Sequence, residues 1–79
     1  MNKMKAVSVK DIGTNGKGQR IVDAFILADT TPDTLPTTGA DIIGLDENCI
    51  FAPFSVLYIA NDAPAKLYIA DTSGKFVAQ

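Results

Sequence analysis

The sequence predicts a small all-β domain, an antiparallel sandwich or barrel-like fold of two hairpin or meander units joined by a long Pro/Thr-rich loop. Short runs rich in Val, Ile, Thr, Tyr and Phe are separated by Gly, Pro, Asn and Asp, which is typical of several short strands. Eight Asp against one Glu disfavour helices, because Asp bonds nearby backbone N–H groups and favours turns. The 79 residues allow a single domain, 1–79.

Residues 1–28 predict an N-terminal hairpin. Val7 and Val9 alternate with small or polar residues, as in a half-buried strand, and the glycines of 13–18 suit a hairpin loop. In 20–28, apolar residues occupy both alternating faces. A helix also fits this segment, but β-branched residues dominate and the run between breakers is short, so a strand is favoured.

Residues 29–48 predict an irregular linker. Pro32 and Pro36 each remove a backbone donor and bias the preceding residue to extended geometry. A loop of this length in so small a domain is expected to have a use. Within it, 40–45 is expected to form one helical turn whose Ile42, Ile43 and Leu45 fill the core.

Residues 49–79 predict a C-terminal three-stranded meander. The sequence Leu-Tyr-Ile-Ala occurs twice, at 57–60 and 67–70, with a short connection between the copies. Antiparallel pairing of the copies is expected to place Tyr58 opposite Tyr68 and Leu57 opposite Ile69. Gly74 suits the left-handed position of the second turn, and Phe25 and Phe76 are expected to be core residues.

The composition argues against an enzyme. There is no His, so the thiol of Cys49 has no general base to activate it for nucleophilic catalysis. Cys49 is the single cysteine and cannot form an intrachain disulfide. We expect no catalytic residues, no cofactor and no metal. A net charge of −2 argues against nucleic acid as a partner, and no apolar run is long enough to span a membrane. The start lacks the apolar region of a signal peptide.

Several short motifs are better explained by structure than by chemistry. Residues 35–39 match the sortase pattern LPxTG but lack the following apolar span and basic tail. The loop 13–18 has the wrong spacing for a phosphate-binding loop. Asp41, Asp46, Glu47 and Asn48 lack the spacing of a calcium loop and are expected to cap turns. Cys49 is expected to be a buried, inert thiol.

A series of short motifs runs through 25–79: Thr34–Gly39, Gly44-Leu45, Ala52-Pro53 with Ser55, Tyr58, Tyr68 and Ser73–Phe76. Their order and spacing resemble a family of short proteins encoded beside the major capsid gene of tailed bacteriophages and prophages, often described as head fibre or capsid-associated proteins. About two thirds of the chain is covered. Phe54 stands where that family usually has Gly, and Phe76 where it usually has Trp.

The resemblance implies a non-enzymatic virion structural protein, a head decoration, head fibre or auxiliary capsid protein. It would lie on the capsid, and in the cytoplasm of the infected bacterium during assembly. The implied partners are the major capsid protein and further copies of the chain, with a trimer favoured. The alternative is a small β-barrel binding module for a peptide or carbohydrate. The residues expected to form the interface are Leu35, Pro36, Phe54, Tyr58 and Tyr68.

The distribution of apolar residues independently predicts association. The segment 56–60 is apolar on both alternating faces, whereas a strand in a small sheet normally has one polar, solvated face. A chain of 79 residues is too short to cover both faces by itself. We therefore expect a partner to cover the second face.

Overall fold

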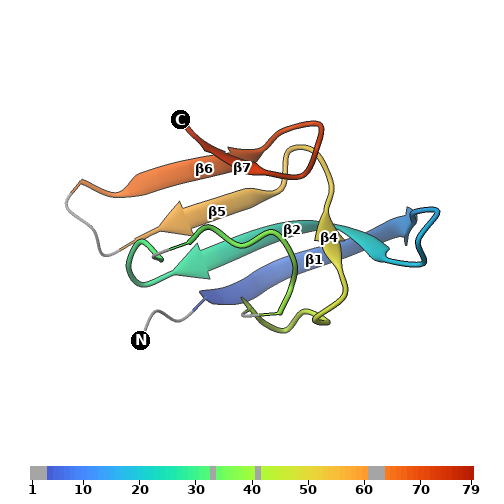
Figure 1. Ribbon diagram of the computed structural model, residues 1–79. Helices are drawn as coiled ribbons and strands as arrows, with labels where there is room; N and C mark the ends of the chain where they lie inside the picture. Colours follow the sequence, from blue (N-terminus) through green and yellow to red (C-terminus); the bar gives the residue numbers. More distant parts are fainter. Residues whose placement is uncertain (1–3, 33, 41, 61–63) are drawn as a thin grey trace.

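The computed structural model describes residues 4–32, 34–40, 42–60 and 64–79, and its two longest strands are the antiparallel pair β1 and β2 (Figure 1). The all-β prediction is confirmed, because the described residues form strands, turns and loops without a helix. The strands are β1 (Met4–Thr14), β2 (Arg20–Ala28), β3 (Ile42–Ile43), β4 (Ile50–Phe51), β5 (Val56–Ile59), β6 (Lys66–Ala70) and β7 (Phe76–Ala78).

The β1–β2 hairpin forms where the sequence predicts it. Its turn is organised by Asn15, whose side-chain Oδ1 accepts hydrogen bonds from the backbone N–H groups of Lys17 (2.9 Å) and Gln19 (3.0 Å). Gly18 has a φ of +80°, which explains why the turn requires glycine. The glycine-rich loop is therefore a hairpin turn. Two register shifts interrupt β1, and each gives the strand one residue more than β2 has opposite it.

The C-terminal strands β5, β6 and β7 form an antiparallel meander. Its second turn is held by Asp71, whose Oδ1 accepts hydrogen bonds from the Ser73 N–H, the Ser73 hydroxyl and the Lys75 N–H. Gly74 follows at a φ of +82°, as its place in the turn predicts. The Asp and Gly of this segment thus fix the reversal between β6 and β7.

The two units join through parallel strands into one mixed sheet, in the order β3-β1-β2-β5-β6-β7. β5 pairs in parallel with the second half of β2, and β4 pairs in parallel with its first half. The sequence predicts the antiparallel pairing within each unit but does not predict this parallel pairing between the units. After β2 the linker crosses back to the other end of the sheet, so that β5 starts beside β2 and runs in the same direction (Figure 1).

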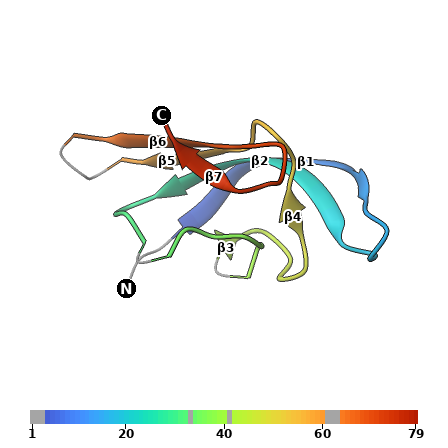
Figure 2. The same cartoon turned by 45° about the horizontal axis from the view of Figure 1, so that its top comes forward.

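The described residues of the linker 29–48 cover one face of this sheet. Figure 2 shows them on one side of β1, β2 and β5, and Ile42 of the linker and Cys49 directly after it are buried in the core. The expected helical turn at 40–45 is wrong. Ile42 and Ile43 instead form β3, which pairs with the start of β1, so that Ile42 is buried while Ile43 is exposed. Leu45 packs against the core as predicted, and Asp41 lies outside the described residues.

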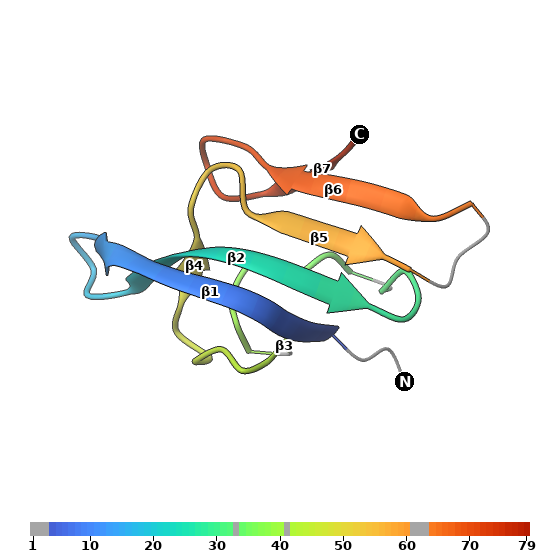
Figure 3. The ribbon, with the colours of Figure 1, turned by 180° about the vertical axis from the view of Figure 1, so that it is seen from behind.

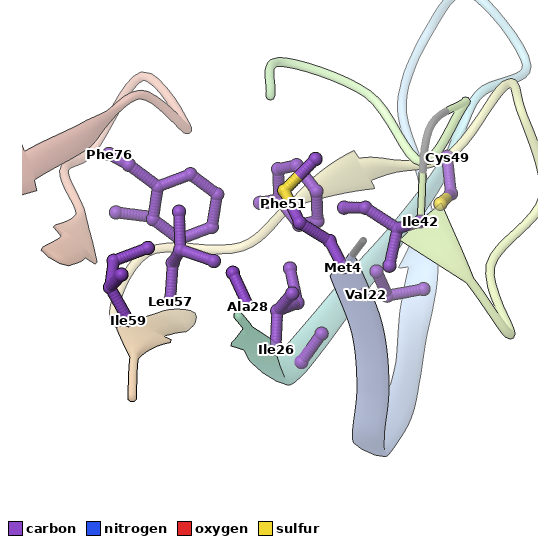
Figure 4. Packing of buried hydrophobic residues seen from close by; sticks show 12 residues of the cluster. Met4, Val22, Ile26, Ala28, Ile42, Cys49, Phe51, Leu57, Ile59 and Phe76 are labelled. Atoms are coloured by element: carbon purple, nitrogen blue, oxygen red, sulfur yellow. The ribbon is translucent and has the colours of Figure 1, made fainter. Parts of the chain in front are cut away.

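The core lies between the linker and the sheet. In Figure 4, Met4, Val22 and Ile42 gather at one end, Leu57, Ile59 and Phe76 at the other, and Phe51 between them. The rings of Phe51 and Phe76 are 4.9 Å apart between centroids. Phe76 is buried, as predicted. The same expectation for Phe25 is wrong, because its side chain is on the opposite face of β2 and is 42% exposed.

Candidate functional site

The five residues expected to form an interface do not lie together. Leu35 and Pro36 are half-buried in the linker, and Leu35 packs against the core. Phe54 is exposed at the turn before β5. Tyr58 and Tyr68 lie on opposite faces of the sheet. Of the five, Phe54 and Tyr58 therefore offer accessible apolar surface, while Leu35 and Tyr68 contribute to packing.

The expected pairing of Tyr58 with Tyr68 is wrong by one residue. Across β5 and β6, Tyr58 lies opposite Leu67, and Tyr68 lies opposite Leu57. Leu57 is completely buried, so Tyr68 shares the core-facing side of the sheet and packs partly against the core. A slip of one residue reverses the face of every side chain in a strand, which explains why the two rings are separated.

The structure brings together a different set of residues, on the sheet face opposite the linker. One cross-strand row places Leu27 beside Tyr58 and Leu67; a second places Phe25 beside Val56, Ile69 and Val77. Figure 3 looks onto this side, where β1, β2, β5 and β6 lie side by side with the linker behind them. We call these seven residues the open face: Phe25, Leu27, Val56, Tyr58, Leu67, Ile69 and Val77.

The open face is contiguous and only partly solvent-shielded. Five of its members are between 36% and 47% exposed, and Val56 and Ile69 are half-buried between them. Sequence alternation placed Phe25 and Leu27 on one side of β2 but could not decide which side faces the core, because both sides are apolar. The alternation in 56–60 did indicate a second apolar face, but Leu67 and Val77 join it only through the strand pairing.

Phe54, two residues before Val56 of the open face, has an unusual backbone conformation. Ala52, Pro53, Phe54 and Ser55 form a turn closed by a hydrogen bond from the Ser55 N–H to the Ala52 carbonyl (3.2 Å). Phe54 has a φ of +72° at the third position, which normally takes Gly or Asn. A left-handed conformation costs a residue with a Cβ roughly 1–2 kcal/mol. The ring is 78% exposed, so burial within the chain does not offset this cost.

A polar cluster lies at the other side of the molecule, where the β1–β2 hairpin meets the linker. The Arg20 guanidinium forms ion pairs with Asp11 (2.7 Å) and with Asp46, and so ties the linker to the hairpin. The hydrogen bond from Arg20 lowers the pKa of the Asp11 carboxyl. A hollow of about 370 Å³ beside this cluster is lined by Gly18, Arg20, Asp46, Glu47, Asn48 and Cys49.

This cluster serves the packing of the linker. The Cys49 thiol is buried and donates a hydrogen bond to the Asp46 carbonyl (3.0 Å), and burial raises the pKa of the thiol. An elevated pKa keeps the sulfur protonated and weakly nucleophilic. Among the described residues, no group of three or more His, Cys, Asp or Glu is placed to hold a metal ion. The negative charge of Asp46 is balanced by its ion pair with Arg20.

The comparisons with known proteins add no family to these observations. No family model, curated protein or solved structure matches the chain. Within the described part of the chain, no helix is long and apolar enough to cross a membrane. The features of the chain that bear on a function are the open face, the turn at Phe54 and the resemblance carried by the sequence motifs.

Proposed function

We propose that this chain is a non-enzymatic structural protein of a bacteriophage virion, which associates with the capsid as a head decoration, head fibre or auxiliary capsid protein. Its partners would be the major capsid protein and further copies of the chain. It would reside on the virion, and in the cytoplasm of the infected bacterium during assembly. Neither nucleic acid nor membrane is part of this proposal.

The open face is the observation that carries the proposal. A solvated sheet normally exposes polar side chains on the face that does not pack on the core, but here the exposed rows are apolar from β2 to β7. Contiguous apolar surface on a small domain marks a site of association. A structural subunit of a larger assembly needs such a surface to contact its neighbours. The motif resemblance favours a bacteriophage capsid as that assembly.

Co-sedimentation with capsids tests the proposal. The purified chain is mixed with capsids assembled from the major capsid protein encoded next to it, and the pelleted fraction is measured. We expect saturable binding at a fixed number of chains per capsid protein. Phe76→Ala, which removes a buried core ring, is the control for binding by unfolded chain. Absence of pelleting, or a gene with no capsid gene as its neighbour, would contradict the proposal.

A second function has one observation in its favour. A shallow groove of about 630 Å³ runs along the outer end of β6 and is lined by Pro64, Ala65, Lys66, Leu67, Tyr68, Ala78 and Gln79. An aromatic ring beside apolar and amide groups is a common setting for a peptide or a sugar. Chemical-shift changes confined to this groove, upon addition of a peptide or oligosaccharide library, would favour the binding-module alternative over the virion role.

A further inference from the structure

The exposed apolar area of Phe54 and the open face together is comparable to the apolar area that one subunit buries in a homodimer interface. Aromatic side chains have areas of about 150–250 Å² and aliphatic ones are somewhat smaller, so the exposed fractions of Phe54 and the open face amount to roughly 500 Å². A stable interface buries about 800 Å² per partner, of which about 65% is apolar in homodimers. The patch therefore supplies about the apolar area that one homodimer interface requires.

The charges around the patch are mixed in sign. Lys10 lies opposite Asp23 at the β1 side, and Asp71 lies beside Lys75 at the β6–β7 turn. Lys5 lies next to Leu27 at the end of the first row. A rim of one sign would select a partner of the opposite sign and would repel a second copy. A rim with both signs does neither, and is compatible with two identical surfaces in contact.

Phe54 indicates that the contact has a specific anchor. Glycine would adopt its positive φ without strain, yet the position carries a large ring that is mostly exposed. Residues held in disfavoured conformations cluster at functional sites. Aromatic residues, Phe among them, are enriched in protein interfaces, and Phe54 precedes Val56 of the open face by two residues, so we expect a partner on the open face to cover this ring.

We propose that two copies of this chain pack open face to open face, with Phe54 of each copy buried against the other. This contact pairs the same surface on both subunits, so it closes as a two-fold dimer. Two sheets stacked in this way lie about 10 Å apart, as in a β-sandwich whose two layers come from two chains. The linker covers the other face of each sheet, so the dimer buries both faces of both sheets.

This inference does not depend on a capsid. A dimer in solution with no capsid binding would contradict the proposed function and leave the inference intact. It also predicts a two-fold pair in place of the trimer that the motif resemblance implies. The two expectations are separated by the mass of the isolated protein.

The experiment is sedimentation velocity of the full chain from low micromolar to millimolar concentration, with three variants. We expect the wild type to reach twice its 8.4 kDa mass. Phe54→Gly removes the anchor and relieves the turn, so its dissociation constant should rise at least tenfold while its melting temperature, measured at a concentration where both proteins are monomeric, does not fall. Val77→Asp places a charge on the open face and should weaken the dimer by a similar factor.

Val9→Asp is the matched control. Val9 has an exposure similar to that of Val77, 42% against 47%, but it pairs with Ala24 on the other face of the sheet. Its dimer should be as tight as that of the wild type. A wild type that stays monomeric or forms a trimer overturns the proposal. Equal effects of the two Asp variants, or a Phe54→Gly variant that dimerises like the wild type, also overturn it.

Discussion

The hydroxyl of Ser55 lies against the backbone of β2 and accepts a hydrogen bond from the Ala24 N–H at 3.3 Å. The same hydroxyl donates to the carbonyl of Val22, also at 3.3 Å. Ser55 is completely buried at the point where β4 has left β2 and β5 has not yet joined it. A side chain thus takes the place of a strand partner, so that the parallel joint between the two units leaves no gap in the pairing of β2.

Ser55→Ala should destabilise the fold through this joint. The substitution leaves the Ala24 N–H without its partner in a buried site, which costs about 1–3 kcal/mol of unfolding free energy. Urea denaturation measures the change. Ser8→Ala, an exposed serine on β1, is the control and should stay within about 0.5 kcal/mol of the wild type. Equal effects of both substitutions would show that the Ser55 hydroxyl does not support the joint.

The two phenylalanines that the sequence places in the core should differ in their cost upon truncation. Phe76 is buried against Phe51, so Phe76→Ala should lower the unfolding free energy by about 3–5 kcal/mol. Phe25 is half-exposed on the open face, so Phe25→Ala should cost about 1–2 kcal/mol. Chemical denaturation at a concentration where the chain is monomeric separates the two. Similar losses would contradict the assignment of Phe25 to the open face.

Local patterns were enough to predict the long strands β1 and β2 and the β1–β2 and β6–β7 turns, but not the short strand β3. The glycines and Asn15 specify the β1–β2 turn, and Asp71 with Gly74 specifies the β6–β7 turn, because each supplies a backbone conformation or hydrogen bond within a few residues of itself. What could not be predicted is the pairing between the units. β2 and β5 are separated by the whole linker, and their parallel contact depends on how that linker packs.

The register of β5 and β6 could not be derived from the repeated Leu-Tyr-Ile-Ala. The repeat suggests that identical residues of the two copies lie opposite each other. The observed register instead places Leu57, Ile59 and Ala70, which are all buried, on the same face of the sheet. The sequence predicts Phe54 and Tyr58 as interface residues, whereas Leu67 and Val77 join the open face only through the strand pairing. When a strand is apolar on both faces, its sequence does not indicate on which face the neighbouring strands add further apolar side chains.

The β6–β7 turn should respond to pH through Asp71. Hydrogen bonds from Ser73, above all from its hydroxyl, and from the Lys75 N–H lower the pKa of the Asp71 carboxyl. A lowered pKa in the folded state stabilises the fold above the unfolded pKa of about 3.9, and this contribution is lost as the pH falls through the folded value. Asp71→Asn keeps an acceptor oxygen but does not titrate. The wild type should therefore lose more stability than the variant between about pH 5 and pH 2.

Thermal unfolding across this pH range, at constant ionic strength, checks the prediction. An NMR titration of the Asp71 carboxyl carbon gives the folded pKa directly, and it should lie below that of an unstructured Asp. Asp23→Asn is a suitable control, since it removes an exposed carboxylate from the middle of β2. Parallel pH profiles for wild type and Asp71→Asn would show that the turn is not held by the ionised carboxylate.

Gly39 is required by the packing of the linker, although the sequence around it matches a sorting signal. Its N–H donates to the Cys49 carbonyl at 3.1 Å, and its carbonyl accepts from the Ile42 N–H at 3.1 Å. A Cβ at this position would lie 2.8 Å from the Leu45 Cβ, and closer still to the Asp46 carbonyl oxygen and the Cys49 sulfur. The linker passes over itself here with no room for a side chain.

Gly39→Ala should therefore cost about 1–3 kcal/mol of unfolding free energy or more, because backbone and a buried sulfur would have to move. Gly16→Ala is the matched control, since its added Cβ meets nothing within 4 Å in the β1–β2 turn. That substitution should be neutral or raise stability by up to about 1 kcal/mol through the unfolded chain. Denaturation curves of both variants measure the difference. If Gly39→Ala were as stable as Gly16→Ala, the linker would not pack on the sheet in the way described, and the face opposite the open face would also be accessible.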